Sequence, residues 1–221
     1  MNLISGAFGQ FANIVKETFH RIFGLADFVA FFLGFRPYKK LRLRVVVLRD
    51  EHGQPLTEMA GLSAALAEAT RVFARSARTR VVAAEPLIVT VDGPSPAKAL
   101  NVHCDDGAWQ EDFAAAGAYF RAASARTILS RLTGYGAPVT VFIVSEISGK
   151  GGCSLGPLTD YVTQEARTVR GNKLMAHEVA HACGLGHSKE TANLMYPKRP
   201  GEILTLGQAA IFRNSRHVTY L

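Results

Sequence analysis

Eleven residues near the C-terminal end of this 221-residue chain constrain its local fold more than any other stretch. They read HEVAHACGLGH over residues 177–187, with histidines at both ends and in the middle. Residues four apart lie on one face of an α-helix, so His177 and His181 are predicted to project side by side. Gly184 permits the left-handed conformation that ends a helix, after which the chain can turn back. The segment therefore predicts a helix, a tight turn, and a third imidazole, that of His187, returning to the first two.

This arrangement is typical of a catalytic zinc site. Imidazole nitrogens bind zinc at about 2.0–2.1 Å, and three protein ligands leave a fourth position for water. Glu178 is turned about 100° from His177 around the helix, which suits work on that water better than direct ligation. Zinc lowers the pKa of its water to about 7, and Glu178 could then move the water's proton to a leaving amine. The spacing predicts one Zn²⁺ on His177, His181 and His187, and hydrolysis of an amide bond.

A methionine follows this segment at a matching offset. Met195 comes eight residues after His187, inside the run NLMYP at residues 193–197. A bare HExxH pattern recurs by chance in helices, and a lone His187 would more often be a surface residue. The third histidine, the glycine and the methionine together make chance a poor explanation. The segment resembles the metzincin clan of zinc endopeptidases, and the run from His187-Ser188 to Pro197 is most similar to its matrixin branch.

The resemblance implies roles for the residues that match the motif. The three histidines would bind one catalytic Zn²⁺, Glu178 would be the general base, and Gly184 would make the turn that ends the helix. Met195 would form the floor of the site in a methionine turn. The segment that begins Tyr196-Pro197 would wall the pocket for the residue after the scissile bond. The implied activity is that of a zinc-dependent endopeptidase with a protein or peptide substrate.

The order of elements fits the fold that the resemblance implies, a zincin/metzincin-like α+β fold. Such a fold has a twisted, mixed, mostly parallel sheet with long helices, an active-site helix and a small C-terminal subdomain. An antiparallel edge strand in it binds extended substrate by strand addition, and residues 154–161 are the candidate here. Hydrophobic periodicity predicts strands over 41–49, 81–91 (broken at Pro86), 139–145 and 158–165 (an edge or return strand), and helices over 57–78, 109–131, from Gly171 or Asn172 through the histidines, and 205–215.

Two features of vertebrate matrixins are missing from the sequence. No PRCGxPD-type segment occurs, so latency through a cysteine switch is not supported. Residues 138–165 also hold too few clustered Asp and His for calcium-binding and structural-zinc loops. The pattern favours a compact, bacterial-type member.

Three cysteines are too few, and too odd in number, for a disulfide framework. Cys183 lies about 200° around the helix from His181, so it is predicted to pack in the core. Cys153 could pair with Cys104 in an oxidising compartment or stay an unpaired, inhibitory thiol. The cysteine count does not decide the compartment.

Residues 1–37 differ from the rest and are predicted to be an N-terminal amphipathic, apolar helical extension, with the catalytic domain over 38–221. Residues 22–35 are almost wholly apolar, but at about 14 residues with Asp27 inside they are short for a membrane span. They also lack the basic start and small-residue cleavage site of a signal peptide. The extension could dock on the domain or its cleft, lie in a membrane interface, or act as an atypical export segment. The helical pattern rests on apolar residues spaced three or four apart: Ile4, Phe8, Phe11, Val15, Phe19 and Ile22.

Basic residues follow the apolar stretch and contribute to a formal net charge of +7. A basic cluster attracts anionic lipid or nucleic acid, unless Arg42 and Arg44 are simply the solvent face of a strand. No aromatic-interleaved or helix-turn-helix pattern supports nucleic acid, so no such partner is predicted. Membrane-surface association through residues 1–49 and a monomeric state are predicted, with localisation at a membrane or export by a non-standard route both open.

Two alternatives to a zinc endopeptidase remain. The first is a membrane-associated binding or regulatory protein whose zinc site is catalytically silent. Glu178 and the open fourth ligand position argue against it, because a structural site needs neither. The second is a zinc hydrolase of a non-peptide amide, which the residues do not distinguish from a peptidase.

Overall fold

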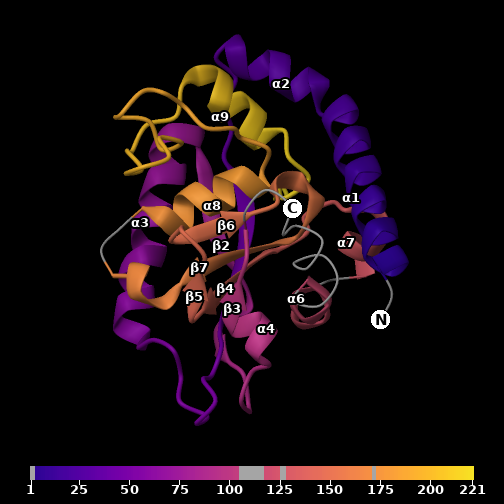
Figure 1. Cartoon of the computed structure of the whole chain (residues 1–221). Coiled ribbons are helices and arrows are strands. Elements are labelled where there is room, and N and C mark those ends of the chain that lie inside the picture. Colours follow the sequence, from indigo (N-terminus) through magenta and orange to yellow (C-terminus); the bar gives the residue numbers. More distant parts are fainter. Residues whose placement is uncertain (1–2, 105–116, 125–127, 171–172) are drawn as a thin grey trace.

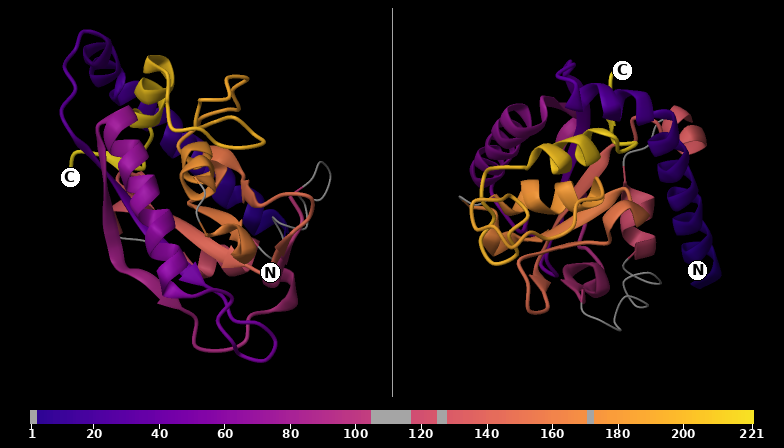
Figure 2. Two further views of the ribbon diagram at one scale, coloured as in Figure 1. Left: turned by 90° about the vertical axis from the view of Figure 1, so that its left-hand side faces the viewer. Right: turned by 90° about the horizontal axis from the view of Figure 1, so that it is seen from above.

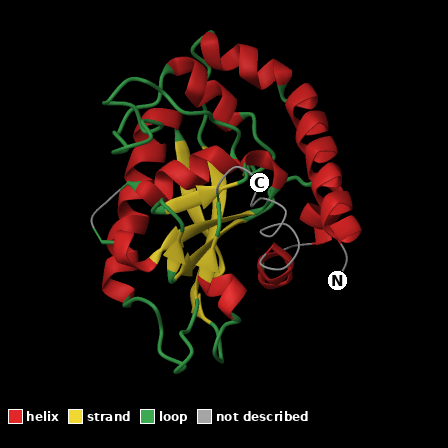
Figure 3. Ribbon diagram, viewed as in Figure 1, coloured by secondary structure: helices red, strands yellow, loops and turns green. Residues whose placement is uncertain are grey.

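The computed structural model describes residues 3–104, 117–124, 128–170 and 173–221, in which helices pack around a central β-sheet (Figures 1 and 3). The strands are β1 (Lys39–Val47), β2 (Thr79–Thr90), β3 (Asn101–Val102), β4 (Val139–Val144), β5 (Glu146–Ile147), β6 (Gly152–Ser154), β7 (Tyr161–Glu165) and β8 (Val218–Thr219). The helices are α1 (Leu3–Phe23), α2 (Leu25–Phe32), α3 (Met59–Ala77), α4 (Ala97–Leu100), α6 (Gly117–Ala123), α7 (Ile128–Thr133), α8 (Leu174–Ala182) and α9 (Leu206–Arg213), with 3₁₀ turns η2 (Gly156–Leu158) and η3 (Ala166–Thr168).

The main sheet is mixed and mostly parallel, as predicted. Its strand order is β2-β1-β4-β7-β6, and β8 pairs with the start of β1. The pairs β1/β2, β1/β4 and β4/β7 are parallel, whereas β6/β7 and β1/β8 are antiparallel. All six residues of β4 are buried, which explains their unbroken apolar run, because inner parallel strands are covered on both faces. In β1, Arg42 and Arg44 are half-buried and alternate with buried leucines, so they are strand-face residues.

Helices cover both faces of the sheet. One core lies between the sheet and α3, α8 and α9, and it contains the inward residues of β1 and β4. A second, smaller core lies on the other face, where Phe142 and Tyr161 meet Phe120 of α6. Figure 2 shows α1 running along the outer side of this layered body. The 38–221 division of the chain stays a prediction, although α1 contacts η2 and α2 contacts α9.

The predicted edge strand over 154–161 is wrong. The antiparallel edge of the sheet is β6, Gly152–Ser154, and residues 156–158 form the η2 turn. The predicted strand over 158–165 is β7, which lies inside the sheet between β4 and β6 rather than at its edge. The edge strand was misplaced because β6 lies in a stretch of glycines, other small residues and one cysteine. This stretch shows no alternation of apolar and polar residues.

Two other predicted elements differ from the structure. β2 continues past Pro86, with a register shift opposite Leu43 and Val45 instead of a break. Pro86 is tolerated because β2 is an edge strand, where a missing N–H costs no ladder bond. The helix predicted over 109–131 lies partly outside the described residues, and the described part contains the short helices α6 and α7.

Two helices match their predictions to within two residues. α3 buries Leu62 and Phe73, as its apolar spacing predicts. α9 begins with a capping box, in which the Thr205 hydroxyl accepts from the Gln208 N–H and the Gln208 side chain accepts from the Thr205 N–H. Among the described helices, none is both long and apolar enough to cross a membrane.

Candidate metal centre

The helix that carries the histidines is one of the most deeply buried elements described. α8 packs on β6 and β7 and beside α3, and seven of its nine residues are buried. Its apolar residues Met175, Val179 and Ala182 face the core, which leaves the polar ones to line the site. The helix begins at Leu174, and the start predicted near Gly171 or Asn172 lies outside the described residues.

Gly184 makes the turn after α8 through a positive φ of 90°. Its N–H donates to the His181 carbonyl at 2.8 Å, and the Leu185 N–H donates to the Ala180 carbonyl at 3.1 Å. These two bonds form a Schellman motif. The motif requires a residue in the left-handed conformation, which glycine adopts without strain. The turn reverses the chain, so that His187 comes back to the helix.

The three imidazoles converge through their Nε2 atoms. The His177 and His181 Nε2 atoms lie 3.0 Å apart, and the His181 and His187 Nε2 atoms lie 3.2 Å apart. Ligand atoms at tetrahedral angles around zinc lie about 3.3 Å apart. In the described part of the chain, these histidines form the one group of three or more His, Cys, Asp or Glu that is compact enough to hold a metal ion.

For two of the three rings, a backbone carbonyl fixes which nitrogen faces the centre. The His177 Nδ1 lies 2.7 Å from the Leu194 carbonyl oxygen, and the His181 Nδ1 lies 2.6 Å from the Leu185 carbonyl oxygen. A carbonyl only accepts, so each Nδ1 carries the proton and each Nε2 presents a lone pair. Two lone pairs that face each other at 3.0 Å repel, and a cation bound between them relieves the repulsion. The donor set therefore fits a metal such as zinc.

Burial keeps two of these rings neutral. Burial is the main cause that lowers the pKa of His177, and it lowers the pKa of His181 to about 4. A neutral imidazole is the form that binds metal, since a protonated ring has no free lone pair. The site is thus prepared for a cation near neutral pH.

The loop after His187 is held in place by its own hydrogen bonds. Met195 is fully buried, and its carbonyl accepts from the Ser188 N–H at 2.8 Å. The buried Asn193 side chain accepts from the Met195 N–H at 2.8 Å and donates to the Gln208 side chain at 2.7 Å. The loop therefore holds the Leu194 carbonyl where it can orient His177.

The residues after Met195 lie nearer to solvent. Tyr196 is half-buried and Pro197 is exposed. Both follow the methionine directly and stand beside the loop that supports the histidines. Their predicted role as a substrate pocket wall stays a prediction.

Glu178 is buried beside the edge strand. It is 5% exposed, and a Cβ on Gly152 of β6 would lie 2.5 Å from its Oε1. Burial raises the pKa of Glu178 to about 8, and the charge of Lys150 offsets this only in part. A carboxylate held in this way is a strong proton acceptor once ionised. Gly152 thus admits Glu178 to the site, a role that no sequence pattern signalled.

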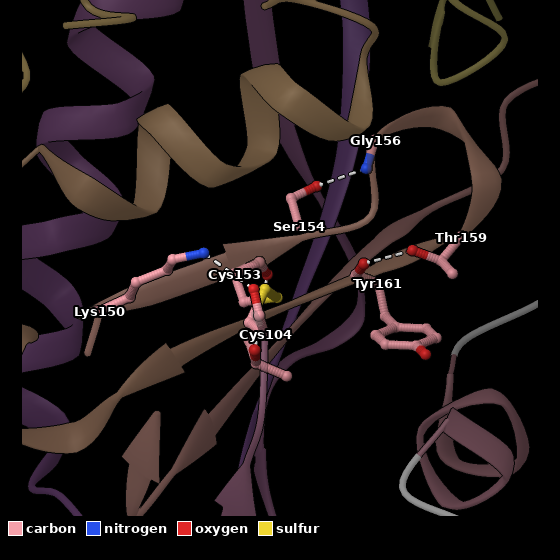
Figure 4. Close-up of a disulfide and its surroundings, with 8 residues drawn as sticks. Cys104, Lys150, Cys153, Ser154, Gly156, Thr159 and Tyr161 are labelled. Atoms are coloured by element: carbon pink, nitrogen blue, oxygen red, sulfur yellow. Dashed lines mark hydrogen bonds between the residues drawn. A yellow bond between two sulfur atoms is a disulfide. The ribbon is translucent and has the colours of Figure 1, made fainter. Parts of the chain in front are cut away.

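A disulfide fastens the edge strand to the neighbouring small sheet. Cys153 of β6 pairs with Cys104, which follows β3 (Figure 4). The Lys150 ammonium donates to the Cys104 carbonyl at 2.8 Å. Of the two states left open for Cys153, the structure therefore shows the paired one. Cys183, the remaining cysteine, is buried and unpaired, as predicted.

The N-terminal helix also touches the turn that follows α8. The Arg21 guanidinium of α1 donates to the Cys183 carbonyl at 3.2 Å, at the C-terminal end of α8. A positive charge there complements the partial negative charge of a helix end. This contact joins residues 162 positions apart, so spacing along the sequence gave no signal for it.

Comparisons with known proteins do not assign this chain to a family, so its function is inferred from the geometry of the site. No family model matches the chain, and no curated protein does. Among solved structures, it is similar to metalloproteinase-II from Bacteroides fragilis, with 14% sequence identity and a TM-score of 0.42. The match covers 77% of this chain and 52% of that one, so this chain spans about half the length of the protein it matches.

Proposed function

We propose that this chain is a zinc-dependent endopeptidase. The observation that carries the proposal is the convergence of three Nε2 atoms, together with a buried carboxylate on the residue that directly follows His177. His177, His181 and His187 would hold the ion, which would polarise the substrate carbonyl and acidify a bound water. A structural zinc site has four protein ligands and no need of a buried glutamate.

Glu178 would carry the proton in this reaction. Its carboxylate would accept a proton from the attacking water and donate it to the leaving amine nitrogen. Burial strengthens its basicity, and Gly152 leaves room for its approach. The side chains of α8 would therefore supply two of the three metal ligands and the proton transfer, and the turn after it would supply the third ligand.

The edge strand would position the substrate. β6 pairs with β7 on one side and is the last strand on the described path of the sheet. An extended peptide can add to such an edge through backbone hydrogen bonds. Because Gly152 of β6 touches Glu178, a peptide bound there would pass close to the proton acceptor.

We place the enzyme in the metzincin type and closest to the matrixin branch. The glycine turn, the third histidine and the buried Met195 in the loop after His187 support this assignment. Tyr196 and Pro197 would form the wall of the pocket for the residue after the cleaved bond. Peptide-library cleavage by wild type and Tyr196→Ala would test the pocket, since an altered preference at that position is expected.

Two variants test the proposal as a whole. Glu178→Ala should keep its zinc and lose peptide hydrolysis, because it removes the proton carrier and leaves the ligands in place. His187→Ala should lose zinc, whereas His52→Ala, at an exposed histidine away from the site, should keep both zinc and activity. Unchanged hydrolysis by Glu178→Ala would contradict the mechanism.

A further inference from the structure

The N-terminal helix α1 turns its polar side toward the protein. Glu17 is 4% exposed and Gln10 is also buried. The Asn13 side chain donates to the Leu158 carbonyl at 2.9 Å, and Arg21 reaches the end of α8. These residues recur three or four apart, so they form one face of the helix. α1 is therefore fastened to the body by its hydrophilic residues.

The apolar side of α1 is left uncovered. Phe8 is 74% exposed, Phe19 is 57% exposed and Phe23 is 82% exposed. An ordinary amphipathic helix of a globular protein does the reverse and buries its apolar stripe. An inverted helix of this kind has apolar surface that remains available to something else.

This uncovered side forms one wall of a broad apolar groove. The groove has a volume of about 820 Å³ and lies between α1 and the segment around α7 and β8. Phe11 and Phe19 line one wall, and Leu132 and Tyr135 line the other. Further large apolar side chains are exposed nearby on α1, α2, α7 and the segment after α2: Ile22, Leu25, Val29, Phe32, Leu33, Phe35, Ile128 and Leu129. Patches of this kind mark interaction surfaces.

Charge around the groove favours an anionic partner. Lys16 lines it, and the one acid there, Asp27, is already paired at 2.7 Å with the buried Lys39, so Asp27 leaves no uncompensated negative charge in the groove. Arg42 lies within reach of Thr219 on the groove's rim, and Lys40 beside it is exposed. A second copy of this surface would bring like charges together, which costs binding energy.

We propose that this groove and the exposed face of α1 bind the surface of an anionic membrane. The phenylalanines would enter the boundary between headgroups and acyl chains, and Lys16 and Lys40 would lie against the anionic headgroups. The polar face of α1 would meanwhile keep the helix attached to the catalytic body. The binding would be interfacial and reversible.

Vesicle co-sedimentation of the full chain tests the proposal. Vesicles of phosphatidylcholine with phosphatidylserine should bind it, and those of phosphatidylcholine alone should bind it far less. The double variant Phe11→Ser/Phe19→Ser should weaken binding by about tenfold or more, because each phenylalanine contributes a substantial apolar transfer energy. The matched control is Met59→Ser on α3, which alters a residue of similar exposure, 55%, outside the groove and should bind as wild type does.

A second measurement does not depend on a weakened variant. Phe23→Trp places a fluorophore on the exposed face, and its emission should shift to shorter wavelength when anionic vesicles are added. No binding of the full chain to anionic vesicles would overturn the proposal. A second result would also overturn it: the chain forms a dimer that the double variant abolishes, while anionic vesicles neither bind the chain nor shift the tryptophan emission.

Discussion

Two glutamates on different helices are almost equally buried, and their surroundings are opposite. Glu17 of α1 faces the Arg21 guanidinium at 2.8 Å and accepts from the Arg216 N–H at 3.2 Å. Glu178 of α8 faces the backbone of Gly152, and within the described residues the charge of Lys150 is the one influence that lowers its pKa. A buried carboxylate kept for structure is compensated by cations and N–H donors. One that lacks such partners, next in sequence to a histidine of the candidate metal centre, fits the proton transfer proposed for Glu178.

The comparison predicts opposite phenotypes for the same substitution at the two positions. Glu178→Gln should lower peptide hydrolysis by about 10²–10⁴-fold, because an amide cannot accept the water's proton. Its zinc content should match wild type, and its free energy of unfolding should not fall, since a neutral amide avoids the cost of burying charge. Activity assays, metal analysis and urea unfolding measure the three. A variant that is less stable but still active would show that Glu178 supports the fold and does not carry the proton.

Glu17→Gln should show the reverse. Removing one partner leaves Arg216, which is 1% exposed at its side chain, with less compensation for its buried charge. The free energy of unfolding should fall by about 3 kcal/mol, measured by urea unfolding. Hydrolysis per folded molecule should stay close to wild type at low temperature. Full stability in this variant would show that the pair is not required.

The region around Arg216 also predicts acid sensitivity. Burial, helped by the charge of Arg216, lowers the pKa of His217 to about 4. Between this value and the ordinary value of 6.5, the unfolded chain binds a proton that the folded one does not. Stability is therefore complete above pH 6.5 and falls as the pH drops toward 4.

The expected loss between pH 7 and pH 5 from this one histidine is about 2 kcal/mol. Urea unfolding of wild type and His217→Asn at both pH values measures it. The variant should lose less stability than wild type over the same interval. Equal losses would assign the acid sensitivity to other groups.

The smallest effect is expected where the two regions touch. Arg21 pairs with Glu17 and donates to the Cys183 carbonyl, so it links α1 to the turn that leads from α8 to His187. Arg21→Ala should raise the zinc dissociation constant by roughly fivefold, the equivalent of one hydrogen bond. Competition with a chromophoric chelator measures this, and Arg21→Lys should restore part of the affinity. Unchanged affinity in Arg21→Ala would show that α1 does not influence the metal centre.

The sequence predicted the parts of the site that depend on near neighbours. A spacing of four places His177 and His181 on one helix face, and a single glycine sets the turn that returns His187. The carbonyl that orients His177 belongs to Leu194, 17 residues away, and the glycine that admits Glu178 belongs to β6. Neither residue could be predicted. Every residue has a backbone carbonyl and glycines are common, so nothing in the sequence shows which of them the fold brings to the site.

The fold shows the same division. Strong apolar patterns located β1, α3, β4 and α9 closely, whereas β6 was missed, because it is short and its residues follow no period. Its identity as the sheet edge depends on pairing with β7, which no local pattern encodes.

The sequence by itself determined that residues 177–187 form a helix, a turn and a returning histidine, and that α1 is amphipathic. These properties follow from backbone geometry over one or two helical turns. Only the tertiary structure decided which side of α1 faces the protein, which glutamate is compensated and which carbonyls fix the imidazoles. Burial and electrostatic environment arise from segments that are distant in sequence, so they take their values only when the chain is folded.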